Sequence, residues 1–374
     1  MTTKNPNSPA VDDLKTNHLA NTALYRKHRP QDWDTVVGQS HIVKILEAES
    51  AKEYPSHAFL FAGSRGTGKT TLARIFAKNI GTAPEDIYEI DAASNTSVED
   101  IRVLNEAVYA LPMNSKFKVY ILDEVHMLSK SAFNAFLKTL EEPPKHVIFI
   151  LATTELHKIP ETIISRCQVF HLKKPSVETL REVIASVAKK EGVKIEEGGL
   201  DLIAHFGNGS FRDTLSSLQT VIGIAKGSSK ASVGAGGSGP VSSAAEISTK
   251  EIEEFLGAPS HIMIADFVEG VIVKKDINSA LQILQAIHAT DMDVRLFTDM
   301  LIHEFRARLL GSVGAGSGSV SGGASGVSGA STAGASSDYV RILDLLLAAK
   351  GELGKTHISI LPLELALFKF FGVK

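Results

Sequence analysis

The sequence has few of the features that mark secreted, membrane or strongly nucleic-acid-binding proteins. Its single cysteine, Cys167, excludes an internal disulfide and a zinc cluster held by cysteines of this chain. The net charge of −3 excludes a general basic field, so any nucleic-acid contact depends on local basic patches or helix N-termini. No apolar run approaches the roughly 20 residues that span a membrane, and the N-terminus has no signal-like apolar core. The 374 residues are 44% hydrophobic and 22% charged, which predicts a soluble, cytoplasmic protein of two or three domains.

The strongest motif is a phosphate-binding loop at residues 63–70, which reads G-x-x-x-x-G-K-T. An apolar run at 58–62 precedes it and a helical apolar pattern follows, and this motif requires that context. The glycines allow backbone N–H groups to surround a polyphosphate, and the positive end of the helix supports them. We expect Lys69 to reach the β- and γ-phosphates and the Thr70 hydroxyl to ligate Mg²⁺. The residues expected to bind the phosphates are Gly63, Ser64, Arg65, Gly66, Thr67, Gly68, Lys69, Thr70 and Thr71.

A second motif is an apolar segment that ends in two carboxylates, Asp123 and Glu124. We expect Asp123 to hold Mg²⁺, mostly through water, and Glu124 to orient and polarise an attacking water. Adjacent acidic residues are common in loops, but this pair lies at the right distance downstream of the phosphate-binding loop. The apolar run at 147–152 ends in Thr153 and Thr154, whose hydroxyls either reach a γ-phosphate or cap the next turn.

Continuous apolar runs separated by helical patterns predict an α/β fold with a mostly parallel sheet. A capping box of Thr96 and Glu99 predicts the start of the helix after the second strand. From residue 175 the apolar positions recur at helical spacing only, which predicts a small helical domain and then a larger one. Two stretches rich in glycine and serine, 226–245 and 311–337, cannot offset their ordering entropy and are expected to be flexible insertions. The expected ranges are 1–24 for a disordered tail, 25–174 for the α/β domain, 175–258 for the helical lid and 259–374 for the last helical domain.

Together these segments resemble the gamma/tau subunits of bacterial DNA polymerase III, the AAA+ ATPases of the sliding-clamp loader. The resemblance runs from about residue 25 to residue 374. The order of a Glu-Glu-Pro-Pro element and a Ser-Arg-Cys element points to clamp loaders rather than to AAA+ proteins in general. The passages that carry it are 25–39, 63–70, 91–94, 118–128, 138–144, 151–154, 165–167 and 209–213.

The resemblance implies a fold and a set of roles for residues of this chain. The fold is an AAA+ P-loop domain with a five-stranded parallel sheet, followed by a helical lid and an all-helical collar. Thr154, or less plausibly Thr153, resembles sensor 1 and Arg212 resembles sensor 2 on the lid. Arg166 resembles the arginine finger that acts on the ATP of the neighbouring subunit. The residues that resemble the adenine-side pocket are Tyr25, Arg29, Val36 and Val37.

The implied function is ATP hydrolysis that loads the beta sliding clamp onto primed DNA during replication. The implied ligands are ATP and Mg²⁺, and the implied partners are delta, delta-prime and further gamma/tau copies in a hetero-oligomeric ring. Such a subunit belongs to the DNA-directed DNA polymerase III holoenzyme without carrying a polymerase active site, and it works at the replisome rather than at a membrane. The alternatives are another AAA+ ATPase of DNA metabolism, such as a branch-migration enzyme, or an ATP-binding scaffold without turnover.

This chain departs from the family in three places. The family usually carries a four-cysteine zinc module between the first two strands, whereas residues 79–90 contain no cysteine and predict no zinc. Relatives have basic residues along the DNA backbone where this chain has Asn95 and Ser97, so contact there would rest on backbone N–H groups and hydroxyls. The sequence ends after the collar, which resembles the short gamma form rather than tau with its extension for polymerase and helicase.

Overall fold

The computed structural model describes residues 22–94, 96–231, 246–290, 292–314 and 332–373. The chain divides into two compact units. The first contains the described residues up to Gly192 together with Gly207–Gly223. The second contains Val193–Phe206 and the described residues from Ile224 onward.

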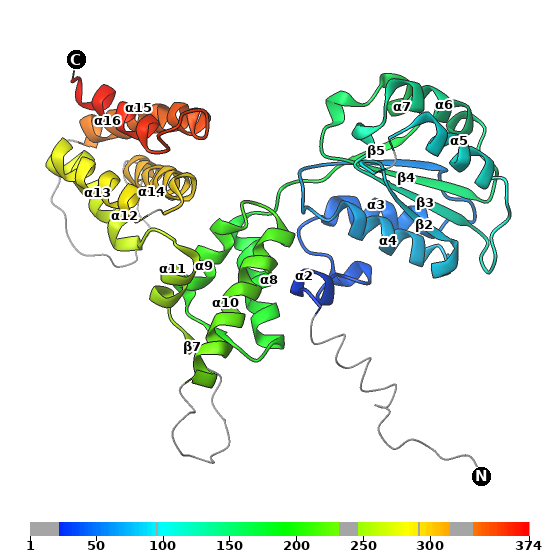
Figure 1. The fold of residues 1–374 in the computed structure, drawn as a ribbon, viewed down its shortest axis with the longest axis horizontal. Helices are drawn as coiled ribbons and strands as arrows, with labels where there is room; N and C mark the ends of the chain where they lie inside the picture. The colour runs from blue at the N-terminus through cyan, green and yellow to red at the C-terminus, as the bar shows by residue number, and fades with distance from the viewer. Residues whose placement is uncertain (1–21, 95, 232–245, 291, 315–331, 374) are drawn as a thin grey trace, which may run out of the picture. The chain divides into compact units, whose positions relative to one another are not determined.

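A five-stranded parallel sheet forms the centre of the first unit, with the strand order β2-β3-β4-β1-β5 (Figure 1). The three inner strands are almost wholly buried, because each has a strand on either side and helices above and below. The prediction of a five-stranded parallel sheet is therefore confirmed. The strands are β1 (Ala58–Ala62), β2 (Ile87–Asp91), β3 (Lys118–Asp123), β4 (Val147–Thr153) and β5 (Gln168–His171).

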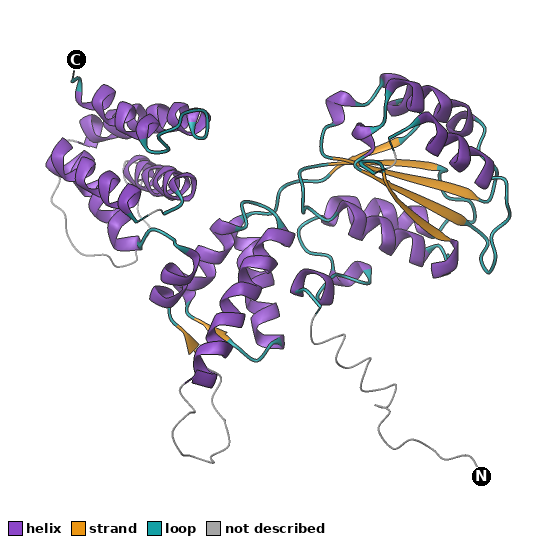
Figure 2. Ribbon diagram, viewed as in Figure 1, coloured by secondary structure: helices purple, strands orange, loops and turns teal. Residues whose placement is uncertain are grey.

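Helices cover both faces of this sheet (Figure 2). Successive side chains of a strand point to opposite faces, so Leu122 and Phe149 enter one core while Ile121 and Ile150 enter the other. Because all the strands are parallel, the segments that follow β1, β3 and β4 meet at the same edge of the sheet. One face is covered by α3 (Ser40–Ser50) and α4 (Lys69–Asn79), and the other by α5 (Val98–Ala107), α6 (Lys130–Glu141) and α7 (Glu161–Ile164).

The short helix α2 (Leu24–Lys27) contacts two helices, α8 (Val177–Lys190) and α10 (Phe211–Ala231), at residues that belong to the first unit. The backbone N–H of Leu24 donates a hydrogen bond to Oε1 of Gln219 on α10 at 2.8 Å. The side chains of Lys27 and His28 both contact the carboxylate of Glu191 at the end of α8, each at 2.7 Å. These contacts fix the segment that leads into the predicted adenine-side residues.

The second unit is helical, with one addition that the sequence pattern does not predict. Two strands of two residues each, β6 (Lys194–Ile195) and β7 (Glu246–Ile247), pair in parallel and are too short to show a period. Phe267 and Phe297 form part of the buried core of the helices, with ring centroids 5.5 Å apart. The helices are α9 (Glu197–Phe206), α11 (Thr249–Leu256), α12 (His261–Val268), a π-helical turn (Glu269–Lys274), α13 (Ile277–Ala289), α14 (Val294–Gly314), α15 (Thr332–Glu352) and α16 (Leu361–Phe371).

Three local features differ from expectation. The capping box of α5 consists of Ser97 and Asp100, not Thr96 and Glu99, so the helix begins one residue later. Helices also continue into the glycine-rich stretches, because extending a formed helix costs little per residue; the rest of those stretches and residues 1–21 lie outside the described residues. The compact units do not divide at residue 174, since α8 falls in the first unit. The three expected domain ranges stay a prediction.

The described helices include none that is both long and apolar enough to cross a membrane.

Candidate nucleotide-binding site

The phosphate-binding loop joins β1 to α4, as its sequence predicts, and depends on glycine at two positions. Gly68 is the N-cap of α4 with φ of 103°, and Gly66 has φ of 74°. L-residues with a side chain rarely adopt this left-handed region. A Cβ on Gly66 would also lie 2.0 Å from Oγ of Ser210, so the loop packs closely against the start of α10.

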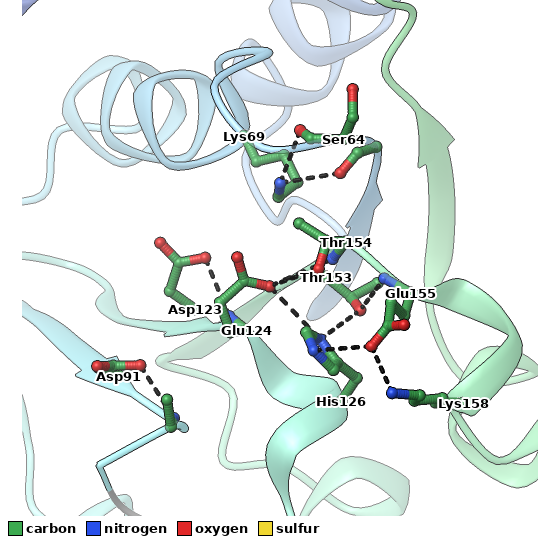
Figure 3. A network of polar contacts seen from close by, with 12 residues as sticks. Ser64, Lys69, Asp91, Asp123, Glu124, His126, Thr153, Thr154, Glu155 and Lys158 are labelled. Atoms are coloured by element: carbon green, nitrogen blue, oxygen red, sulfur yellow. Dashed lines mark hydrogen bonds and ion pairs between the residues drawn. The ribbon is translucent and has the colours of Figure 1, made fainter. Parts of the chain in front are cut away.

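Lys69 is buried at the start of α4. Its Nζ donates hydrogen bonds to the carbonyl oxygens of Gly63 at 2.9 Å and Ser64 at 3.1 Å. Burial lowers the pKa of Lys69, and the nearby carboxylates of Glu124 and Asp123 oppose that change. The ammonium therefore lies inside the loop, within reach of any anion that the loop holds (Figure 3).

Thr70 and Asp123 lie side by side, although they come from different elements. Oγ1 of Thr70 donates a hydrogen bond of 2.7 Å to Oδ2 of Asp123. The other oxygen of Asp123 accepts from the backbone N–H of Glu124 at 3.0 Å. Hydroxyl and carboxylate oxygens are the ligands that Mg²⁺ prefers. The residues present therefore fit a magnesium ion beside the loop.

Glu124 follows β3 with a left-handed backbone, at φ of 49° and ψ of 43°. Such strain in a residue other than glycine is concentrated at functional sites. Oε2 of Glu124 accepts hydrogen bonds from Oγ1 of Thr154 at 3.1 Å and from its backbone N–H at 3.3 Å (Figure 3). Thr154 therefore reaches the cavity-lining carboxylate, whereas Thr153 is fully buried and pairs with His126.

A cavity of about 420 Å³ within the first unit brings most of the predicted residues together. Part of its wall comes from α8, through Glu182, Val183 and Ser186, which sequence reasoning missed. Val183 belongs to the helical apolar pattern that begins at residue 175, and no sequence signal distinguishes a cavity-facing position of that helix from a core-facing or solvent-facing one. The predicted residues that line the cavity are Tyr25, Arg29, Val36, Val37, Arg65, Gly66, Thr67, Gly68, Lys69, Thr70, Thr71, Asp123, Glu124 and Arg212.

Positive side chains lie close to the ring of Tyr25, at one end of the cavity. The guanidinium carbon of Arg212 lies 5.7 Å from the centre of the Tyr25 ring, and that of Arg26 lies 5.8 Å from it. Burial lowers the pKa of Arg29, the nearby Arg74, Arg212 and Arg26 lower it further, and Glu89 opposes the change. The cavity wall as a whole carries both signs, because the carboxylates of Asp123, Glu124 and Glu182 line it as well as the cations. The arginines around Tyr25 form a local positive cluster, which favours an anion at that end.

Arg166 does not line this cavity. Its guanidinium group forms an ion pair with Glu141 and donates a hydrogen bond of 2.6 Å to the carbonyl oxygen of Thr162. It lies in a separate shallow depression that also includes His57. Within one chain, the structure thus separates Arg166 from the other predicted catalytic residues.

The segment expected to follow DNA is only partly described. Asn95 lies outside the described residues, while Ser97 is exposed and caps α5. Oγ of Ser97 contacts Oδ2 of Asp100 at 2.6 Å and accepts from its backbone N–H at 3.2 Å. The hydroxyl therefore already has partners within the helix cap.

Comparison with known proteins identifies relatives of this chain. Residues 81–176 match the family described as "DNA polymerase III, delta subunit". DNA polymerase III subunit tau of Bacillus subtilis (strain 168) is 48% identical over 221 residues, covering 54% of this chain and 39% of that protein. DNA polymerase III subunit gamma of Buchnera aphidicola (subsp. Baizongia pistaciae) is 42% identical over 225 residues, covering 54% of this chain and 61% of that protein.

The resemblance to the gamma/tau subunits is confirmed. The gamma/tau-like chain spans about two fifths to three fifths of the length of these relatives. Among solved structures it is similar to Thermotoga maritima RuvB, a Holliday junction branch migration motor, with a TM-score of 0.50 and 22% identity. That likeness covers 69% of this chain and 85% of RuvB, and it shows a shared fold alone.

Proposed function

We propose that this chain is the ATPase subunit of a clamp loader, which uses ATP to load a sliding clamp onto primed DNA. One observation carries the proposal: a phosphate-binding loop, a fitting magnesium site and the strained Glu124 line one cavity in a chain related to gamma and tau. The likeness to RuvB extends to the fold only, so nothing specific favours branch migration.

In the proposed reaction, backbone N–H groups of the loop bind the phosphates of ATP. Lys69 exchanges its carbonyl acceptors for phosphate oxygens, and Thr70 and Asp123 hold Mg²⁺. A bound Mg²⁺ would neutralise negative charge on the phosphates. Glu124 orients and polarises the water that attacks the γ-phosphate.

We further propose sensor roles for Thr154 and Arg212. Thr154 donates hydrogen bonds from both its hydroxyl and its backbone N–H to Oε2 of Glu124. A contact of Thr154 with the γ-phosphate would therefore change the position of the Glu124 carboxylate. Arg212 lines the cavity from α10 and lies over the ring of Tyr25. It would stabilise the negative charge that develops in the transition state. Because Arg212 lies on α10, this contact would also link the position of that helix to the bound nucleotide.

Arg166 is proposed to act on the ATP of a neighbouring subunit. Its separation from the chain's own cavity supports this role, and so does its partial exposure, since 33% of its side chain is accessible. The proposed assembly is a hetero-oligomeric ring of gamma/tau copies with delta and delta-prime, acting on the beta clamp and primed DNA. Tyr25, Arg29, Val36 and Val37 would hold the nucleoside end of ATP.

Phosphate release by the reconstituted complex tests this function. The expected result is turnover of MgATP that Lys69→Ala abolishes, because the loop then lacks its cation. A complex that binds MgATP without any phosphate release would instead be a scaffold. A complex that hydrolyses ATP but never places a clamp on primed DNA would be an ATPase of another DNA process.

A further inference from the structure

His126 is a nearly buried histidine between two carboxylates, and it lies outside the lining of the cavity. Its side chain is 8% exposed and lies on the turn that follows Glu124. Nδ1 lies 3.4 Å from Oε2 of Glu124, and Nε2 lies 3.2 Å from Oε2 of Glu155 (Figure 3). Each ring nitrogen therefore faces a carboxylate oxygen from a different element.

Two contacts on the β4 side hold the imidazole of His126. A hydrogen bond from Lys158 keeps the pKa of Glu155 below its usual value, so its carboxylate stays ionised and only accepts. Nε2 of His126 then carries the hydrogen of that contact, and in the imidazolium form Nδ1 also carries a hydrogen, which can be donated toward Oε2 of Glu124. On the other side, Oγ1 of Thr153 lies 3.1 Å from Nδ1 and accepts from the backbone N–H of Glu155 at 3.0 Å. The orientation of the imidazole ring is thus set by Glu155 and Thr153, independently of Glu124.

The contacts recorded for the carboxylate oxygens of Glu124, among the described residues, all fall on Oε2. They come from Thr154 on one side and His126 on the other, and the second oxygen is directed away from His126 (Figure 3). The last torsion of a glutamate side chain is broad and has no sharp preferred value. Without His126, Thr154 alone would restrain the carboxylate.

We propose that His126, held by Glu155 and Thr153, is a positioning residue that keeps Oε2 of Glu124 against β4 and so presents the other oxygen to the attacking water. This inference rests on the proposed ATPase function. His126 acts only through Glu124 and does not touch the nucleotide. Misplacing a reacting group by about 1 Å costs up to a hundredfold in rate, so the effect falls on kcat rather than on ATP binding.

Two substitutions separate the sides of the ring. In His126→Asn the amide lies near the position of Nδ1 and can still meet Glu124. In His126→Gln it lies near the position of Nε2 and meets Glu155 instead. In the reconstituted complex with MgATP, we expect Asn to keep kcat within about threefold and Gln to lose about tenfold or more. KM for ATP and the affinity for a fluorescent ATP analogue should stay within about twofold in both.

His157 provides the control, because it is exposed on the turn after β4 (Leu156–Lys158) and makes no recorded hydrogen bond in the described chain; it acts on Glu155 through charge alone. His157→Gln is expected to keep the wild-type kcat, and all three variants are expected to keep their melting temperature within a few degrees. Equal kcat in the two His126 variants, whether high or low, would overturn the inference, as would a change confined to KM. A wild-type complex that binds MgATP without turnover would overturn the proposed function and this role with it.

Discussion

Replacing Arg166 separates a catalytic role from a structural one, because the two predict effects of very different size. The ion pair between Arg166 and Glu141 is open to solvent, with side chains 33% and 47% exposed. Exposed pairs contribute about 0–1 kcal/mol to stability. Arg166→Ala should therefore lower the melting temperature of the domain by at most about 4 °C. If the side chain is an arginine finger, the rate should instead fall by about 10³–10⁵.

The assay is steady-state phosphate release by the reconstituted complex with MgATP, clamp and primed DNA. Affinity for a fluorescent ATP analogue should stay unchanged in Arg166→Ala, because the residue lies outside its own cavity. Glu141→Gln is the matched control, since it breaks the same ion pair and leaves Arg166 in place. The control should keep its turnover. Equal losses in the two variants would show that the pair serves structure and would refute the finger role.

Mixing variants tests whether Arg166 acts between subunits. Copies with Lys69→Ala lack a working site but still present Arg166, whereas copies with Arg166→Ala keep the site and lack the finger. Neither alone should hydrolyse ATP, and mixed complexes should recover part of the wild-type rate. If the mixture hydrolyses no more than the separate variants, the proposed action in trans is wrong.

The remaining predictions concern the base, the loop and a buried carboxylate. Glu124→Gln should bind MgATP normally but lose about 10²–10⁴ in kcat; single-turnover kinetics showing a wild-type rate would contradict this. Gly66→Ala should weaken ATP binding and lower the melting temperature more than Gly81→Ala, since both have a left-handed φ, of 74° and 79°, but only the first meets Ser210. Equal melting temperatures for those two variants would exclude the steric argument. Backbone N–H groups of Met113 and Asn114 hold the pKa of Asp86 below its ordinary value of 3.8, so its stabilisation is present above that pH and is lost as the pH falls through the lowered pKa. Asp86→Asn should therefore lower the stability measured in urea at pH 7 and reduce its fall in acid; an unchanged acid profile would contradict the assignment.

The sheet and the loop were predictable because their signals are local. Buried parallel strands must be apolar on both faces, so the runs around Phe59 and Ile150 are readable without a partner strand. The loop needs glycine where the backbone is left-handed, as at Gly66 and Gly68. Both signals follow from constraints that act within a few residues.

Features that depend on distant packing were not predictable. Thr96 with Glu99 and Ser97 with Asp100 are similar capping patterns in sequence, and the structure uses Ser97, with Ile101 and Leu104 of α5 in the core. His126 belongs to no sequence motif that would predict its role. The role depends on its contact with Glu155, which lies 29 residues later in the printed sequence. Of the α8 side chains that line the cavity, Val183 looks like a core position in the sequence, and Glu182 and Ser186 look like solvent-facing positions.

The central claim is that ATP hydrolysis at this site is coupled to a clamp and primed DNA. Its most direct test is the rate of phosphate release by the reconstituted complex when clamp and primed DNA are both added, compared with the rate when they are withheld. The account predicts a higher rate with both present, together with clamp retained on the DNA. A rate that stays the same in their presence, with no clamp on the DNA, would contradict it.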